Sequence, residues 1–202
     1  MDLQISVFCP AAAPVPGFLR LLPVLQAAAK LQKNDPIIIA IDGRAASGKT
    51  TLTGLLQQIL SADVIHMDDF FLPPALRTEE RLSEPGGNIH YERFCEEVKN
   101  GLASGKPFEY GVYSCAEGCI TETKTVVPKG VVIIEGSYSL HPEMQISYDL
   151  KIFVEASEEI RLQRILQRNG EAALEIFKSK WIPLENKYFE FFGIKDKCDI
   201  VI

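Results

Sequence analysis

The sequence contains no apolar run that approaches the roughly 20 residues of a membrane-spanning helix, so we expect no membrane partner. It also has no excess of basic residues, because 27 aspartates and glutamates outnumber 21 lysines and arginines and leave a net charge of −6. Nucleic-acid binding usually needs a basic face, so we expect no nucleic-acid partner either. The first residues include an acidic second position and no basic stretch, which makes a poor signal peptide. We therefore expect a cytoplasmic protein.

Cysteine is scarce and its number is odd, with residues at positions 9, 95, 115, 119 and 198. In a chain without a signal peptide, such thiols are expected to stay reduced. Cys115 and Cys119 lie four positions apart, but no second pair with metal-ligand spacing accompanies them. The sequence therefore does not predict a zinc site.

The 202 residues show instead an alternation of apolar strands and helices, in a composition that is 47% hydrophobic. Strands are expected at 37–41, 64–67, 131–136, 149–155 and 198–202, and helices at 50–60, 91–104, 158–168 and 171–192. This alternation predicts an α/β fold with a mainly parallel, five-stranded sheet in one domain, 1–202. Residues 1–34 are expected to form an N-terminal extension to the core, 35–202, and the helical composition of residues 18–33 predicts a packing helix.

A phosphate-binding motif lies between the first predicted strand and its helix. Residues 43–50 read Gly-Arg-Ala-Ala-Ser-Gly-Lys-Thr, which fits G-x-x-x-x-G-K-[ST]. In this motif, backbone N–H groups wrap a phosphate chain at the positive end of a helix. We expect Lys49 to contact the β and γ phosphates of ATP and Thr50 to bind Mg²⁺. The alternative is a glycine-rich turn with an exposed lysine. The predicted nucleotide-binding residues in the motif are Gly43, Ala45, Ala46, Ser47, Gly48, Lys49, Thr50 and Thr51.

The motif and its strand–helix context predict a P-loop NTPase three-layer sandwich, and in such a sheet ligands bind beyond the carboxyl ends of the strands. Asp68 and Asp69 follow the second predicted strand, and Glu135 ends the third. We expect Asp68 to act as general base toward a substrate hydroxyl, although a turn or helix-capping aspartate is the alternative. For Asp69 a role in substrate binding and a purely structural role are equally open. Glu135 is expected to bind Mg²⁺ or substrate, or else to be a solvated strand end.

Three arginines share one face of the predicted helix at 158–168. Arg161, Arg164 and Arg168 are spaced by three and four residues. Such a face could close over the phosphates and stabilise charge in the transition state, or it could be an ordinary solvated basic face.

In these motifs the sequence resembles the uridine kinase-like group of P-loop small-molecule kinases, which also includes nicotinamide riboside kinases and phosphoribulokinases. The resemblance is carried by IDGRAASGKTTL, HMDDFFLP, YERF, KPFEYGVYS, VVIIEGSYSL and DLKIFVEASEEIRLQRILQR, in the family's order. It implies an ATP- and Mg²⁺-dependent kinase that phosphorylates a hydroxyl of a small-molecule acceptor, most simply a nucleoside. The implied roles are catalysis for Lys49, Asp68, Glu135 and Arg164, nucleotide binding for Arg161 and Arg168, and acceptor binding for Asp69, Phe70, Tyr91, Tyr110 and Tyr113.

Several positions depart from the family pattern. Gly111 and Cys115 stand where uridine kinases usually have an aspartate and a histidine that hold the nucleoside. The helix that carries the arginines ends in Arg168-Asn169-Gly170, which predicts a shortened lid. These differences keep open a non-nucleoside alcohol, pantothenate- or sugar-like, and a nucleotide-binding relative without transfer activity. A GTPase switch is not expected, because Asn-Lys-x-Asp and a post-strand Asp-x-x-Gly are both missing. His141 precedes a proline and is expected at the surface.

Overall fold

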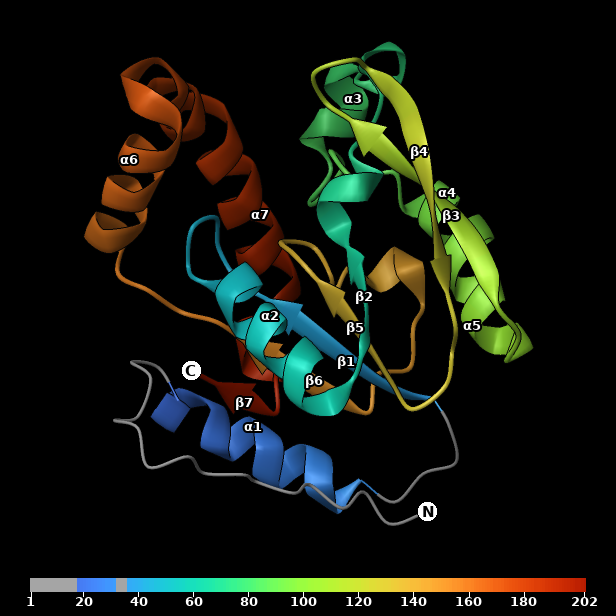
Figure 1. Cartoon of the computed structure of the whole chain (residues 1–202). Helices are drawn as coiled ribbons and strands as arrows, with labels where there is room; N and C mark the ends of the chain where they lie inside the picture. Colours follow the sequence, from blue (N-terminus) through green and yellow to red (C-terminus); the bar gives the residue numbers. More distant parts are fainter. Residues whose placement is uncertain (1–17, 32–35) are drawn as a thin grey trace.

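A parallel five-stranded sheet lies at the centre of the protein, whose computed structural model describes residues 18–31 and 36–202 (Figure 1). The strand order is β2-β5-β1-β6-β7, and every neighbouring pair is parallel. The predicted α/β fold and its five strands are therefore confirmed. The strands are β1 (Ile37–Asp42), β2 (Asp63–His66), β5 (Val131–Glu135), β6 (Leu150–Phe153) and β7 (Ile200–Val201).

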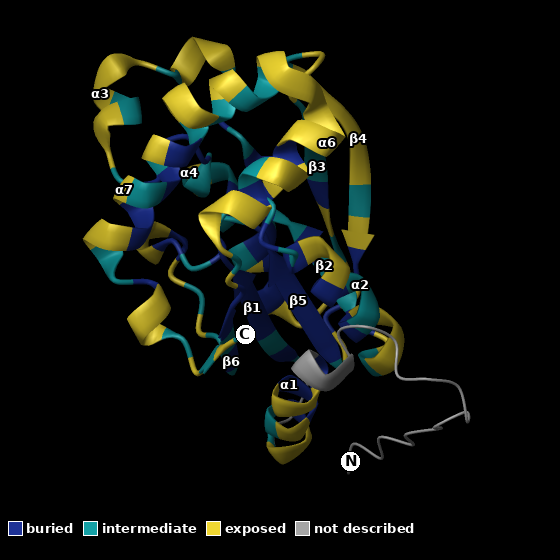
Figure 2. Ribbon diagram, turned by 90° about the vertical axis from the view of Figure 1, so that its left-hand side faces the viewer, coloured by how far each residue is buried: buried dark blue, intermediate teal, exposed yellow. Residues whose placement is uncertain are grey.

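Helices cover both faces of the sheet, which makes the three-layer sandwich that the motif predicts. On one face, α1 (Phe18–Lys30) and α2 (Lys49–Leu60) share a core with Ile39 and Ile133. On the other face, Val132 and Ile134 share a core with α4 (Tyr91–Phe94), α5 (Asn100–Ser104) and α7 (Ile182–Phe192). Alternate residues of one strand thus point to opposite layers, and the strands are buried between exposed helices (Figure 2).

The described part of the N-terminal extension is the helix α1. Leu21, Val24, Leu25 and Ala28 are buried on one side of it, at the spacing of a helix face. Pro23 lies inside the helix on its exposed side and does not end it. The helix therefore packs against the core. Among the described residues, no helix has the length and apolar character needed to cross a membrane.

Two arms project beyond the carboxyl ends of the central strands (Figure 1). One arm holds α3 (Glu79–Ser83) and an antiparallel hairpin of β3 (Phe108–Ser114) and β4 (Cys119–Val126). The other arm consists of α6 (Glu158–Ile176) and α7, which run in opposite directions. Within α6, Gly170 adopts φ 81° and ψ 174°, which interrupts the helix directly after Arg168-Asn169. The interruption lies at the Arg168-Asn169-Gly170 segment from which the sequence predicts a shortened lid.

Candidate active site

The phosphate loop connects β1 to α2, and its two glycines are required by its geometry. Gly43 has φ +148°, and a Cβ at this position would lie 2.3 Å from the carbonyl oxygen of Val154. Gly48 has φ +111° and forms the N-cap of α2. Both conformations strongly favour glycine, so the motif residues fold the loop tightly around the helix N-terminus.

Lys49 lies inside this loop with only 8% of its surface exposed. Its ammonium donates to the carbonyl oxygens of Gly43 at 2.7 Å and Arg44 at 3.0 Å, and to the Ser137 hydroxyl at 3.3 Å. All three partners are neutral groups, so the ammonium of Lys49 can still form an ion pair with an anion bound in the loop. The buried hydroxyl of Ser47 has no hydrogen-bond partner among the described residues. Both observations fit a loop built to hold phosphate oxygens.

A chain of hydrogen bonds joins the start of α2 to the ends of β5 and β2. The Thr50 hydroxyl donates to Glu135 Oε1 at 3.2 Å, and Glu135 Oε2 lies 2.7 Å from His66 Nδ1. This hydrogen bond is the largest cause of the raised pKa of the His66 imidazole. Burial acts in the opposite direction and lowers the pKa. Glu135 is only 4% exposed, so His66 takes the place of solvent as the partner of its carboxylate.

The oxygen donors Thr50 and Glu135 fit Mg²⁺, which prefers hard oxygen ligands and shares them with substrate phosphates. The described residues contain no cluster of three or more His, Cys, Asp or Glu side chains that could hold a metal ion. The described residues therefore do not form a complete set of protein ligands for a metal ion.

Asp68 lies just beyond β2, in the short helical turn Met67–Phe70, and it opens into the same cavity as Lys49. Loss of hydration raises the pKa of its carboxyl, and the negative charge of Glu135 raises it further. Lys49 and His66 act in the opposite direction. A carboxylate whose pKa is raised toward neutrality is a better proton acceptor than an ordinary surface aspartate.

A cavity of about 870 Å³ joins these groups and has walls from both arms. The phosphate loop, Asp68 and Glu135 lie at its base, while Trp181 of the α6–α7 arm and Cys115 of the β3–β4 hairpin belong to opposite walls. Of the predicted site residues, the cavity brings together Ala45, Ala46, Ser47, Gly48, Lys49, Thr50, Thr51, Asp68, Glu135, Arg164 and Arg168.

The three arginines of α6 have different positions. Arg164 donates to the carbonyl oxygens of Ala46 at 2.9 Å and Ser47 at 3.1 Å, so it holds the outer side of the phosphate loop. Arg168 lines the cavity and donates to Asn169. Arg161 is buried and faces a separate, smaller cavity. The common helical face predicted from the spacing is therefore divided between two cavities.

The residues expected to bind the acceptor lie outside the cavity lining. Asp69, Phe70 and Tyr110 are buried, where the Tyr110 hydroxyl donates to Asp69 Oδ2 at 3.1 Å and the Tyr110 ring stacks on Phe70. Lys124 completes this group with an ion pair to Asp69 at 3.0 Å. Asp69, Phe70 and Tyr110 thus have their partners within the hairpin arm, and none of the three is among the residues that line the cavity.

Tyr91 and Tyr113 also have protein partners or are buried. The Tyr91 ring stacks on His141 and lies under the guanidinium of Arg81, while Tyr113 is 6% exposed. The expectation that His141 is exposed is wrong, because it is 4% exposed, between Tyr91 and Tyr188. Its ring Nε2 lies 3.0 Å from the Pro85 carbonyl oxygen, and burial lowers its pKa.

Sequence reasoning missed Asp42, which ends β1 directly before the phosphate loop. Its carboxylate accepts from the backbone N–H groups of Gly43, Tyr138 and Leu140 and from the Tyr188 hydroxyl at 2.8 Å. Complete burial raises its pKa to about 6. The aspartate thus ties β1 to the segment after β5 and to α7, which fixes the loop that follows it.

The other missed residues lie in the cavity. Glu185 of α7 accepts from the Ala45 N–H at 2.9 Å and from the Ser137 hydroxyl at 2.7 Å. Near Asp68, on the hairpin side, the cavity is lined by Phe71, Arg77, Asn88, Cys115 and Tyr138. These residues come from separate segments of the sequence, which only the fold brings together.

Comparison with known proteins gives a consistent result. The model of the "Phosphoribulokinase / Uridine kinase family" matches residues 38–172, which span the phosphate loop, Asp68, Glu135 and the three arginines. Among curated proteins, the chain is similar to a uridine kinase of Ligilactobacillus salivarius (strain UCC118), with 28% identity over 85% of this chain and 86% of that protein. It is also similar to a uridine kinase of Haemophilus ducreyi, with 29% identity over 82% and 84%.

Solved structures share the fold. A protein from Bacillus stearothermophilus described as a possible uridine kinase superposes with a TM-score of 0.70, covering 93% of this chain and 100% of that chain. Its sequence is 19% identical, so this similarity concerns the fold alone.

Proposed function

Because the chain belongs to the phosphoribulokinase / uridine kinase family, we propose that it is a cytoplasmic kinase acting as a single domain. It transfers the γ-phosphoryl group of ATP to a hydroxyl group of a small metabolite, with a nucleoside as the leading acceptor. The observation that carries the proposal is the position of Asp68 in one cavity with Lys49 and Thr50. The curated relatives named uridine kinase support the nucleoside.

The residues of the chain divide the work of phosphoryl transfer. The loop N–H groups and Lys49 hold the phosphates, and Arg164 braces the loop from outside through the Ala46 and Ser47 carbonyls. Asp68 orients the acceptor hydroxyl and accepts its proton as the bond to phosphorus forms. When bound, Mg²⁺ neutralises phosphate charge, and Thr50 and Glu135 are the residues that would hold it. Positioning and charge neutralisation carry most of the rate in such a site.

A second candidate acceptor is an alcohol that also carries an anionic group. Arg77 lines the cavity near Asp68, and its Nε donates to the Leu72 carbonyl oxygen at 2.6 Å. Among the described residues, no carboxylate forms an ion pair with Arg77. A guanidinium in this position suits a carboxylate or phosphate on the acceptor, whereas a neutral nucleoside does not need one.

The test is phosphoryl transfer from ATP and Mg²⁺ to a panel of acceptors. The panel contains uridine, cytidine, nicotinamide riboside, pantothenate, glycerate and simple sugars, with Lys49→Ala as the blank. Preference for a nucleoside, retained in Arg77→Gln, supports the first candidate. Preference for an anionic alcohol, with a KM that rises at least tenfold in Arg77→Gln, supports the second.

Asp68→Asn separates transfer from nucleotide binding. We expect a fall in kcat of about 10²–10⁴-fold, because the general base is lost while the loop contacts to phosphate remain. Nucleotide binding measured by calorimetry should be unchanged within about twofold. Unaltered turnover in this variant would remove Asp68 from the mechanism. Wild-type protein that binds ATP but phosphorylates nothing in the panel would favour a binding role.

A further inference from the structure

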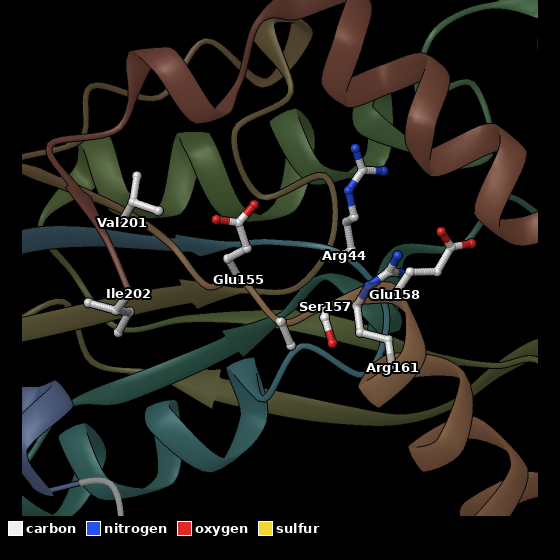
Figure 3. Close-up of a pocket in the computed structure, with 8 residues that line it drawn as sticks. Arg44, Glu155, Ser157, Glu158, Arg161, Val201 and Ile202 are labelled. Atoms are coloured by element: carbon white, nitrogen blue, oxygen red, sulfur yellow. The ribbon is translucent and has the colours of Figure 1, made fainter.

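A second cavity, of about 650 Å³, lies beside the phosphate loop (Figure 3). It is formed by Arg44 of the loop, by the start of α6 and by the end of β7. Ile202 borders both this cavity and the larger one, so the two are neighbours. The remaining lining residues are Glu155, Ala156, Ser157, Glu158, Arg161 and Val201.

Arg161 is a buried cation in the wall of this cavity, and Glu185 and Glu158 are the carboxylates whose charges attract it. It is 5% exposed, and its Nε and one terminal nitrogen, Nη1, have no hydrogen-bond partner among the described residues. No carboxylate in the described part of the chain forms an ion pair with it. Buried polar groups without hydrogen-bond partners are costly, so the two unpartnered nitrogens of Arg161 indicate a place for a further acceptor.

A second arginine, Arg44, lines the same cavity, and its guanidinium is directed away from Arg161 toward α7. Figure 3 shows the Arg161 side chain extending toward Arg44, and the positive charge of Arg44 adds to burial in lowering the Arg161 pKa. The Arg44 guanidinium donates to Asn186 and lies over the Phe189 ring, which fixes its position. The positive charges of the two arginines repel each other, and an anion bound in the cavity would offset this repulsion.

The N-terminus of α6 contributes to the same positive field. This 19-residue helix begins at Glu158, and the Ser157 hydroxyl caps it by accepting from the Ile160 N–H at 3.4 Å. Of the two glutamates in the lining, Glu155 is bound by Lys195 at 2.8 Å. Glu158 is exposed and lies in the first turn of the helix. Its carboxylate attracts the Arg161 cation without forming an ion pair with it.

We propose that this cavity is an anion site for a small phosphorylated metabolite, separate from the site of the nucleotide phosphates. Planar guanidinium forks match the oxygens of a phosphate group, and a helix N-terminus adds favourable charge. The volume exceeds what a phosphate alone needs, and Ala156, Val201 and Ile202 offer an apolar wall to an organic body. The inference does not depend on phosphoryl transfer by the larger cavity.

The experiment measures the melting temperature of the full chain as inorganic phosphate is titrated at constant ionic strength. A saturating non-hydrolysable ATP analogue with Mg²⁺ fills the phosphate loop, so that phosphate can act only elsewhere. We expect a saturable rise of about 3–5 °C at ten times Kd. Arg161→Gln should abolish this rise. Lys178→Gln removes an exposed cation that is paired with Glu175 and does not line the cavity, and it should leave the rise intact.

Arg44→Gln is a second variant that serves if Arg161→Gln does not fold, and it too should lose the rise. In crystals soaked with tungstate, an anomalous peak between Arg44 and Arg161 is the corresponding structural result. The proposal is overturned if phosphate has no effect beyond chloride, or if the Arg161→Gln and wild-type responses are equal. It is also overturned if the ATP analogue abolishes the response, because the cavity would then belong to the nucleotide site. Lys49→Ala disables the nucleotide site. If the rise in melting temperature with phosphate is retained in this variant, the result supports the proposal, because the second cavity then binds phosphate independently of the nucleotide site.

Discussion

Asp42 shows how a single buried side chain can hold a functional loop in place. Its two carboxylate oxygens accept four hydrogen bonds, three from backbone N–H groups and one from a tyrosine hydroxyl. These donors come from three separate parts of the chain. Replacing the carboxylate therefore affects the phosphate loop, the segment after β5 and α7 together.

We expect Asp42→Asn to lower the free energy of unfolding by about 1–3 kcal/mol, since the amide NH₂ cannot accept from the Leu140 N–H. The loss should be smaller at pH 7 than at pH 4.5. The folded-state pKa of Asp42, about 6, lies above its ordinary value of 3.8, so folded protein holds this proton more tightly. The contribution of Asp42 to stability thus falls as pH rises between these values. Urea unfolding of both proteins at the two pH values measures this difference. If the free energies of unfolding of wild type and Asp42→Asn change in parallel with pH, the prediction is contradicted.

The His66–Glu135 pair should contribute stability with a pH dependence that follows from the raised pKa of the histidine. The contribution is complete below the unfolded pKa of about 6.5 and is lost as pH rises through the higher folded value. His66→Gln should therefore destabilise the protein more at pH 6 than at pH 9. Chemical unfolding at the two pH values gives the difference, and an NMR titration of the imidazole gives the pKa directly. An equal loss at both pH values would show that the pair is not ionic.

At the scale of the element, the α6–α7 arm depends on the interruption at Gly170. Its φ of 81° with ψ of 174° is a combination that residues with a Cβ rarely adopt, and nothing lies within 4 Å of the position where a Cβ would be. The requirement for glycine is therefore conformational and not steric. This corner places Arg168 and Trp181 in the wall of the cavity.

Gly170→Ala should cost about 1–3 kcal/mol of stability and weaken nucleotide binding, because the arm can no longer turn without strain. Gly54→Ala is the matched control. Gly54 lies within α2, its φ is not positive, and a Cβ there would also contact nothing within 4 Å. The same substitution at this position should stabilise the protein by about 0.5–1 kcal/mol. Thermal or urea unfolding of the two variants compares them, and a shared sign would refute the conformational explanation.

At the scale of the whole molecule, bound nucleotide should stabilise both arms and the sheet as one unit. ATP with Mg²⁺ at 100 times Kd adds about 2.7 kcal/mol, which corresponds to a rise in melting temperature of about 5–10 °C for a chain of this size. Lys49→Ala should lose this rise. Trp181 is the single tryptophan and lines the cavity, so its fluorescence should change over the same titration. A rise that persists in Lys49→Ala would place the nucleotide outside the phosphate loop.

The sequence predicted the features that depend on short segments. The phosphate loop and Asp68 follow strands, Glu135 ends one, and the parallel sheet brings those strand ends to one edge. The five strands and the helix at the N-terminus were predicted for the same reason, because their apolar periodicity is local.

The acceptor side of the site could not be predicted in this way. Tyr110 and Phe70 lie in motif segments, but β3 carries Tyr110 into the core, where its ring stacks on Phe70 of the turn after β2. His141 looked exposed beside a proline, yet two distant aromatic rings enclose it. Arg77, Asn88 and Glu185 have no motif, and only the packing of the two arms brings them to the cavity. These positions depend on tertiary contacts that local sequence does not encode.

The central position of β1 has a consequence for the order in which a ribosome delivers the chain. β1 emerges early, but its two neighbours in the sheet are β5 and β6, and the Tyr188 hydroxyl that binds Asp42 comes later still. A nascent chain that has reached only the β3–β4 hairpin carries the whole phosphate motif with no strand beside it. Nucleotide capture should therefore begin only after β5, β6 and α7 have been synthesised, and the exposed β1 segment is where a chaperone would be needed until then.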